Sequence, residues 1–429
     1  MNSPVLTPAT PSAASPHGKK LWLTLFAAFL GWMFDGMEMG IFPLVASPAL
    51  KAMQLAQGIE GDWFVKLWMG RITALFLLGA AAGGLVFGWL GDRIGRVKAM
   101  TYSILTYSLF AGLAYFAQQP WQLGALRALG ALGMGGEWSL GVALVMESWP
   151  ADKRPWMAAS IGAAANLGYC LIAGIGILFP ITQDSWRWVM LVGATPAILT
   201  FLIRLFVPES ELWKEAQSKP ATNPVREIFA PALLRNTTLA IVFASVALIV
   251  TWGIVQWIPL WADEMAKKAN HPLKDTAKAY AQLFQSMGAV IGSLSAPLLG
   301  IYFGRRPIYF VLCFSSLLAC TLLFQTFSAV SPGFFAVVLL VGACTSSFYG
   351  WLPQYLPELF PTRVRATGQG LAFNFGRVFA ATGAWQMGAL LSLFGGSYPK
   401  AGMTVCTVYL VGMACVWLAP ETRGKPLPE

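Results

Sequence analysis

The sequence KLWMGRITALFLLGAAAGGLVFGWL at residues 66–90 is followed at 91–98 by the loop sequence GDRIGRVK. A helix needs about 20 mostly apolar residues to cross roughly 30 Å of hydrocarbon, and residues 66–90 are long enough to do so. The loop that follows is short and basic. We therefore expect a membrane-spanning helix that ends in a basic loop.

The same alternation of apolar runs and short polar loops continues along the rest of the chain. It predicts twelve spans, near 21–45, 66–90, 99–117, 121–147, 156–180, 187–207, 236–262, 279–302, 306–327, 332–358, 367–393 and 399–419. The longest polar connection separates the first six spans from the last six. We therefore expect an all-α, polytopic membrane protein with twelve transmembrane helices in two six-helix bundles.

This division predicts five parts of the chain. Residues 1–18, rich in Pro, Ser, Ala and Thr, are expected to form a disordered cytoplasmic tail. Residues 19–207 form the N-terminal bundle, 208–235 a cytoplasmic interdomain loop, 236–419 the C-terminal bundle and 420–429 a second cytoplasmic tail. The first apolar run lacks a small-residue cleavage site after a short hydrophobic core, so it is expected to be a retained helix.

Composition excludes several other classes of protein. The chain is 56% hydrophobic and 11% charged, whereas soluble domains are about 25% charged. The net charge of +10 comes from basic residues in short loops, which is typical of cytoplasmic loops and not of a nucleic-acid-binding face. The six cysteines lie in apolar runs without metal-ligand spacing, so neither disulfides nor a metal site is expected. Charge bias favours cytoplasmic termini, and the short loops favour a bacterial inner membrane.

Three short motifs occur twice, once in each half of the chain. Glu147–Arg154 and Glu358–Arg365 share the pattern E-x-x-P-x-x-x-R, Pro208–Ser210 matches Pro420–Thr422, and Gly162-x-x-x-Asn166-x-Gly168 matches Gly370-x-x-x-Asn374-x-Gly376. Parallel repeats of six helices imply two bundles around an axis along the membrane normal. A substrate site is then expected between the bundles, near the membrane midplane.

The loop after the second span resembles the signature of the major facilitator superfamily, G-x-L-x-D-R-x-G-R-[KR]-x-[KR]. Here it reads GWLGDRIGRVK from Gly88 to Lys98, with Val97 at the first basic position. The counterpart in the second half, Gly300–Pro307, keeps Gly304, Arg305 and Arg306 but lacks the acidic residue. The resemblance implies a secondary transporter that works by alternating access.

The resemblance also implies a cytoplasmic latch that stabilises the outward-facing state. Its residues are the signature loop and the two E-x-x-P-x-x-x-R elements. In this sequence they are Gly88, Asp92, Arg93, Gly95, Arg96, Glu147, Arg154, Glu358 and Arg365. Ordinary capping of the loops is the alternative interpretation.

Three further segments are similar to particular branches of the superfamily. Arg127–Trp138, followed by Glu147-Ser-Trp-Pro150, looks like the sialate and metabolite:proton symporters, and Asp35-Gly-Met-Glu38 resembles the DGxD element of aromatic-acid:proton symporters. Asn374-Phe-Gly-Arg377 is similar to the segment that places an arginine in organic-anion carriers. The Pro-Glu-Ser and Pro-Glu-Thr motifs also occur in sugar porters, but the paired glutamines of sugar porters are missing from span 236–262.

Ionisable residues inside the spans are candidates for function, because each costs at least about 2.5–3.5 kcal/mol to insert. Asp35 and Glu38 are three residues apart and share a helix face. Two carboxyl groups so close favour a proton on one of them, as a proton carrier requires. Arg127 lies at a similar depth, and we expect it to pair with Asp35 or Glu38 and to be released when that acid is protonated. A static ion pair that braces the N-terminal bundle is the alternative.

Glu137 and Arg377 fall near the midplane, judged from the 1.5 Å rise per residue of a helix. A buried arginine needs a partner, and its planar fork matches a carboxylate. We expect Arg377 to bind a substrate carboxylate, with Glu137 as its competitor in the empty site and a role for Glu137 in proton coupling. A structural contact between Arg377 and the backbone is the alternative. Asn166, Gln256, Tyr349 and Asn374 are further candidates for substrate binding, or else form hydrogen bonds between helices.

Together these features predict proton-coupled symport of a small organic anion, a carboxylate, by alternating access. Motifs for phosphate binding, a serine nucleophile or a zinc protease are missing, so we expect no enzyme and no cofactor other than the coupling proton. The expected partners are the substrate and the lipid bilayer, not nucleic acid, and we expect a monomer. The alternatives are a carrier of sugars or neutral metabolites, an exporter of amphiphilic drugs, and a sensor that does not transport.

Overall fold

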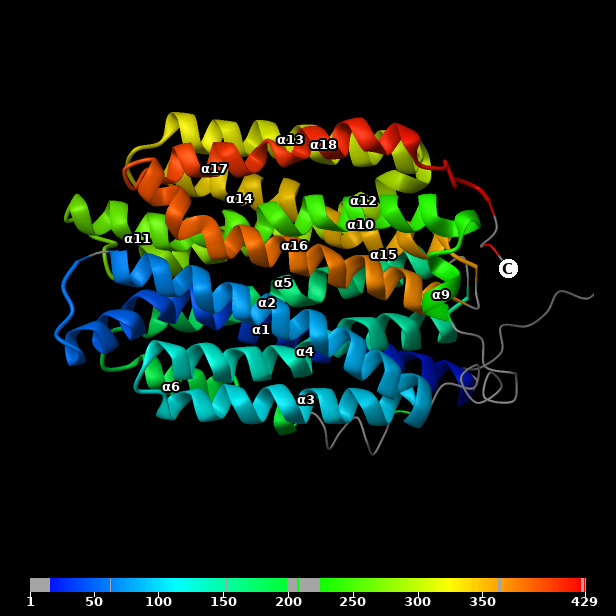
Figure 1. Cartoon of the computed structure of the whole chain (residues 1–429), viewed down its shortest axis with the longest axis horizontal. Helices are drawn as coiled ribbons and strands as arrows, with labels where there is room; N and C mark the ends of the chain where they lie inside the picture. The colour runs from blue at the N-terminus through cyan, green and yellow to red at the C-terminus, as the bar shows by residue number, and fades with distance from the viewer. Residues whose placement is uncertain are drawn as a thin grey trace, which may run out of the picture.

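The apolar runs of the sequence form long helices that lie side by side along one axis of the molecule (Figure 1). The structure, a computed structural model, describes residues 16–61, 63–150, 153–198, 207, 224–361, 364–425 and 428. Within these residues the regular elements are α-helices and short 3-10 helices, without any strand. The all-α fold class predicted from the sequence is confirmed.

The helices of the first half agree with the first six predicted spans. They are α1 (Pro16–Ala56), α2 (Trp63–Ile94), α3 (Arg96–Leu113) with the 3-10 helix η1 (Ala114–Phe116), α4 (Pro120–Ser148), α5 (Arg154–Leu178) and α6 (Trp186–Val192). Residues 199–206 of the sixth predicted span lie outside the described residues. Proline stands in the first turn of α4 and of α5, where its missing N–H leaves no helical hydrogen bond unmade.

The helices of the second half agree with the last six predicted spans, but several spans are interrupted. The elements are α9 (Pro224–Ile228), α10 (Pro231–Gly253), η2 (Val255–Trp257), α11 (Ile258–Lys268), α12 (Ala277–Phe303), α13 (Arg305–Thr326), α14 (Pro332–Ser346), α15 (Phe348–Tyr355), η3 (Leu356–Leu359), α16 (Arg365–Leu393), α17 (Tyr398–Cys406), α18 (Val408–Cys415) and η5 (Val416–Leu418). The break between α10 and α11 places Gln256 in a tighter turn, beside the centre of the molecule.

The surface of the helices is suited to lipid. Among the described segments, eight are long and apolar enough to cross a membrane. Large apolar side chains such as Trp89, Phe116, Leu178, Leu393 and Trp417 are each more than half exposed. Soluble proteins rarely expose apolar side chains over so much of their surface, whereas hydrocarbon tails cover them without cost.

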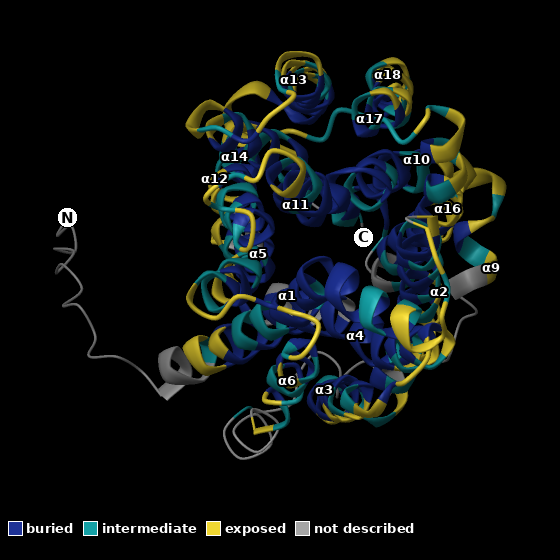
Figure 2. Ribbon diagram, turned by 90° about the vertical axis from the view of Figure 1, so that its left-hand side faces the viewer, coloured by how far each residue is buried: buried dark blue, intermediate teal, exposed yellow. Residues whose placement is uncertain are grey.

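The two halves share one packing pattern and meet along two seams. In the first half α2 packs against α4 and α1 against α5, and in the second half α12 packs against α14 and α10 against α16. The seams between the halves are formed by α5 with α12 and by α2 with α16, on opposite sides of the molecule (Figure 2). This repeated arrangement is the two-bundle fold that the duplicated motifs predict.

Glycine lets the backbones of α1 and α5 come into contact near the centre of the first half. A Cβ atom on Gly36 would lie 1.9 Å from the carbonyl oxygen of Ala165, and one on Gly168 would lie 1.8 Å from that of Met33. No larger residue fits at either position, as is common where membrane helices cross closely. The contact fixes the height of Asp35 relative to Asn166.

The start of α1 and the C-terminus lie at the same end of the molecule (Figure 1). We call this end the proximal face and the other end the distal face. Helices α2 and α4 both run from the distal to the proximal face, and the loop between α1 and α2 lies on the distal face.

Candidate functional site

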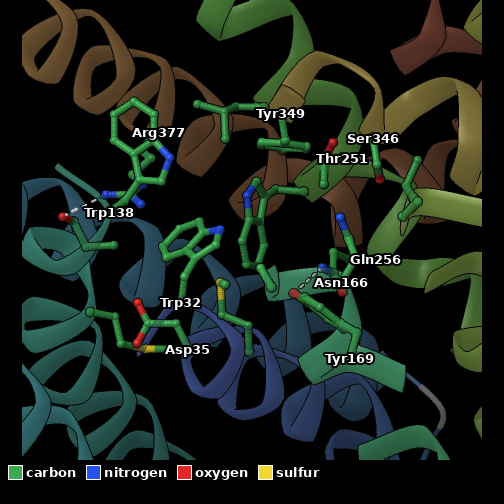
Figure 3. Close-up of a pocket in the computed structure, with 18 of the residues that line it drawn as sticks. Trp32, Asp35, Trp138, Asn166, Tyr169, Thr251, Gln256, Ser346, Tyr349 and Arg377 are labelled. Carbon is green, nitrogen blue, oxygen red and sulfur yellow. Dashed lines mark hydrogen bonds between the residues drawn. The ribbon is translucent and has the colours of Figure 1, made fainter. Parts of the chain in front are cut away.

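A cavity lies between the two halves, near the middle of the helices. Its volume is about 90 Å³, measured as the space open to the centres of water molecules, which is room for several waters. Helices α1, α2, α4 and α5 supply one wall, and α10, α12, α14, α15, α16 and η2 supply the other. Figure 3 shows Arg377 and Asp35 on one side of the cavity, and Asn166, Tyr169 and Gln256 on the other.

Arg377 is the charged group of the second half that faces this cavity. It lies on α16, is 8% exposed, and donates from Nη1 to the carbonyl oxygens of Ala80 at 3.3 Å and Gly135 at 3.5 Å and to Oδ1 of Asn374 at 3.1 Å. Its guanidinium also lies over the ring of Phe373, 5.0 Å from the ring centre. Among the side chains that the structure describes, no carboxylate lies within ion-pair distance of Arg377.

These contacts decide between the partners considered from the sequence. Arg377 bonds to backbone carbonyls of the first half, which is the structural alternative, and not to Glu137. The carbonyl bonds are long and neutral, so they compensate the buried charge only in part. Asn374 acts as a neighbour that holds Arg377 and is not on the cavity wall, since its amide packs into the space beside Gly84.

Asp35 and Glu137 form a pair of buried carboxyl groups inside the first half. Asp35 on α1 is fully buried and Glu137 on α4 is 2% exposed. The Glu137 carboxyl occupies the space that Gly31 leaves open, since a Cβ atom there would lie 1.9 Å from its Oε1. The two carboxyl groups are in side-chain contact, and no N–H or O–H of the described residues donates to either of them. Such a pair is favourable only if one carboxyl carries a proton and donates it to the other.

Glu38 and Arg127 form a separate ion pair on the distal side of this carboxyl pair. Arg127 Nη1 donates to Glu38 Oε1 at 2.9 Å, and both side chains are almost fully buried. The guanidinium also contacts the rings of Phe42 at 4.7 Å and Phe76 at 5.1 Å. The sequence left Asp35 and Glu38 as possible partners of Arg127. In the structure Arg127 pairs with Glu38, and Asp35 contacts Glu137 instead.

Neutral polar groups line the remaining walls and bridge the halves. Asn166 Nδ2 lies 3.2 Å from Ser293 Oγ, and Gln256 Nε2 donates to the hydroxyl of Tyr169 at 2.8 Å. The hydroxyl of Tyr349 is in contact with Thr251 and makes no hydrogen bond to any other described group. These groups could accept or donate hydrogen bonds to a bound molecule.

The signature loop at the proximal end of α2 is only partly described. Gly95 has a φ angle of 107°, which glycine adopts without strain, and Arg93 stacks over Trp89 at 4.4 Å. Arg96 is half-buried, and a Cβ atom on Gly88 would meet nothing within 4 Å. The side chains of Asp92, Glu147, Arg154 and Arg365 lie outside the described residues, so the latch implied by the resemblance stays a prediction.

Part of the corresponding network of the second half is described, without the side chain of Arg365. Arg305 donates to the Glu358 carboxylate at 2.9 and 2.7 Å, and the Thr422 hydroxyl donates to the same carboxylate at 2.6 Å. Glu421 accepts the backbone N–H groups of Arg305 and Arg306 at the start of α13. Burial raises the pKa of Glu421, but the surrounding backbone donors outweigh this effect and hold the pKa below its usual value. Three repeated sequence motifs therefore meet at the proximal face.

The structure brings some of the predicted residues to one cavity and leaves others behind it. Asp35, Asn166, Gln256, Tyr349 and Arg377 line the cavity. Glu137 and Asn374 stand directly behind Asp35 and Arg377, whereas Glu38 and Arg127 lie towards the distal face.

Sequence reasoning missed most of the aromatic lining. The missed residues are Trp32, Phe76, Tyr169, Trp252 and Phe373. A signal was present, because several of them stand three or four positions along the chain from a polar candidate. Trp32 precedes Asp35, Tyr169 follows Asn166, Trp252 precedes Gln256 and Phe373 precedes Arg377.

Comparison with known proteins agrees with this architecture. Residues 21–384 match the family model described as Major Facilitator Superfamily. The chain is 29% identical to an inner membrane metabolite transport protein of Escherichia coli strain K12, with 92% of this chain and 90% of that protein covered. It is 27% identical to a 3-(3-hydroxy-phenyl)propionate transporter of the same strain, with 98% of each covered. The crystal structure of a D-xylose-proton symporter is similar with a TM-score of 0.75 and 17% identity, covering 95% of this chain and 100% of that chain, which shows the fold alone.

The two acidic sites predict opposite effects on stability when a carboxylate is replaced by an amide. Glu38→Gln leaves Arg127 buried without its counter-charge, so it should cost about 3 kcal/mol. Glu137→Gln supplies an N–H donor to a carboxyl pair that lacks one, so it should be neutral or stabilising. Thermal unfolding in detergent, followed by tryptophan fluorescence at neutral pH, measures both. Equal losses in the two variants would contradict this assignment of the pairs.

Proposed function

Because the chain belongs to the major facilitator superfamily and is a membrane transporter, we propose that it carries a small organic carboxylate together with a proton. It is a carrier and not an enzyme. The observation that supports this substrate most directly is Arg377, a buried cation that faces the cavity with only neutral partners among the described residues. A carboxylate in the cavity would supply the missing counter-charge, and the planar fork of arginine suits it.

The aromatic walls favour a flat substrate. Rings of Trp32, Phe76, Trp138, Trp252 and Phe373 surround the cavity. Flat rings stack favourably on such side chains. The name of the related phenylpropionate transporter supports a ring that carries a carboxylate. The polar groups on the opposite wall would then bind substituents on the ring.

The carboxyl pair of Asp35 and Glu137 would hold the coupling proton. Asp35 faces Glu137, Glu38 and Arg377, so its charge responds to an anion bound at Arg377. A bound anion weakens the attraction between Arg377 and an ionised Asp35, and thereby favours protonation of the pair. Proton and carboxylate would then bind together, because the proton offsets the negative charge that the carboxylate brings into the cavity. In this account the ion pair of Glu38 and Arg127 braces the N-terminal half.

Alternating access would move this site between the two membrane faces. We assign the proximal face to the cytoplasm, because the basic signature loop, the start of α1 and the C-terminal end of the described chain lie there (Figure 1). The related inner membrane protein supports a bacterial inner membrane as the location. The transporter would act as a monomer, since the cavity is formed within one chain.

Uptake by proteoliposomes tests the substrate class. Labelled carboxylates and neutral sugars are offered to the purified protein, with and without an inward proton gradient. The proposal predicts accumulation of a one-ring carboxylate that the gradient stimulates. Uptake of neutral sugars alone would contradict the proposal and indicate a sugar carrier. Export of amphiphilic drugs would indicate a drug exporter. The absence of all transport would indicate a sensor.

Arg377 is expected to set affinity for the carboxylate. Arg377→Ala should weaken binding about tenfold to a hundredfold, since a hydrogen-bonded ionic contact is lost, and Arg377→Lys should lose less. Arg71 is a matched control, because it is another arginine within a span that lies between Trp68 and Trp385 and does not line the cavity. The KM of uptake in Arg377 and Arg71→Lys variants measures the difference. Unaltered affinity in Arg377→Ala would remove the assignment.

Asp35 is expected to couple transport to the proton. Asp35→Asn should abolish stimulation by the proton gradient while exchange of substrate across the membrane continues, because the amide cannot take up or release a proton. Asp263→Asn is the matched control, since Asp263 is a buried carboxylate paired with Lys267 outside the cavity. Gradient-driven accumulation that is unchanged in Asp35→Asn would show that the proton binds elsewhere.

A further inference from the structure

Two pairs of aromatic rings cross from one half to the other at the cavity. Trp138 on α4 stacks on Phe373 on α16, with ring centres 4.5 Å apart and an interplanar angle of 15°. Phe76 on α2 contacts Trp252 on α10, with centres 5.4 Å apart and an angle of 36°. All four rings line the cavity, and each pair takes one ring from each half. The halves therefore cannot separate at either place without breaking a ring contact.

The two pairs lie on opposite sides of the cavity along the membrane normal. Trp138 is ten residues from the proximal end of α4, and Phe373 is eight residues from the proximal start of α16. Trp252 stands near the distal end of α10, and Phe76 lies in the distal half of α2. The Trp138–Phe373 pair thus lies on the proximal side of the cavity, and the Phe76–Trp252 pair lies on the distal side.

The distal pair also separates two spaces. A second cavity of about 10 Å³ lies beyond it and is lined by Arg127, Thr73 and Phe42. Phe76 and Trp252 line both this small cavity and the large one. Further out the halves meet again, where Lys278 Nζ donates to the carbonyl oxygen of Ile181 at 3.0 Å.

The proximal pair is connected to the candidate binding group. Phe373 stands one helical turn before Arg377, and the Arg377 guanidinium lies over the Phe373 ring. Trp138 stacks on the same Phe373 ring. Tyr349 contacts the edge of the same ring from α15, with centres 6.5 Å apart. A ligand that draws Arg377 away from the carbonyl groups of Ala80 and Gly135 therefore acts on the proximal pair directly.

We propose that Trp138 and Phe373 form the proximal gate of the cavity, that Phe76 and Trp252 form the distal gate, and that one gate opens at a time. The proposal rests on the transporter function proposed above but needs no particular substrate. Each pair is a contact that exists only while its side is closed. Loss of one pair shifts the molecule towards the form that is open on that side, by about twofold to tenfold for one aromatic contact.

Cysteine labelling in membrane vesicles tests the proposal. Ala289→Cys places a reporter in the cavity wall, where the natural chain has no cysteine. A membrane-impermeant maleimide is added to right-side-out and to inverted vesicles. The exposed loop residue Gln57, as Gln57→Cys, establishes which vesicles present the distal face.

Ring removal should change labelling in opposite directions for the two gates. Phe76→Leu and Trp252→Leu should raise the rate of reporter labelling from the distal face about twofold to tenfold and lower it from the proximal face. Trp138→Leu and Phe373→Leu should do the reverse. Each gate has two variants, so one that fails to fold is replaced by its partner.

A stacked pair inside one half is the matched control. Phe284 on α12 stacks on Phe335 on α14 with centres 5.4 Å apart, and both helices belong to the second half. Phe284→Leu should leave the ratio of labelling from the two faces unchanged. The proposal is overturned if the four gate variants change this ratio in one common direction, or no more than the control does. Labelling needs no substrate, so a failure of the carboxylate assignment would leave this result interpretable.

Discussion

Arg377 carries a positive charge inside the protein, where the described part of the chain offers it carbonyl and amide oxygens but no carboxylate. A guanidinium in such a place is costly, and three neutral acceptors on one nitrogen repay only part of the cost. Two of those acceptors belong to the other half of the molecule. The same contact therefore joins the two halves and leaves the charge of Arg377 without a carboxylate partner among the described residues.

The buried carboxyl pair needs a proton, as the buried Arg377 needs an anion. Asp35 and Glu137 lie against each other without a donor, so the closed form is favourable when they share a proton. Asp35 is also within electrostatic reach of Arg377. In the proposed function, anion and proton would satisfy neighbouring charges in one cavity, which gives a physical reason for binding them together.

The sequence predicted the fold closely, because apolar run length and loop charge follow directly from the membrane. It also singled out Asp35, Arg127, Glu137 and Arg377, since a buried charge is conspicuous in an apolar run. It could not choose the partners. Whether Arg127 meets Asp35 or Glu38 depends on the rotation of α1 against α4, which periodicity does not set. Most of the aromatic lining was missed because tryptophan and phenylalanine occur both in packed helix interfaces and on lipid-facing surfaces.

Equilibrium binding of benzoate and benzamide to the purified wild-type protein tests the central claim most directly. The two molecules share one flat ring and differ in charge at a single group. Quenching of tryptophan fluorescence reports binding, because Trp32, Trp138 and Trp252 line the cavity. If Arg377 awaits a carboxylate, benzoate binds at least about tenfold more tightly than benzamide. Equal affinity, or tighter binding of benzamide, would contradict the account.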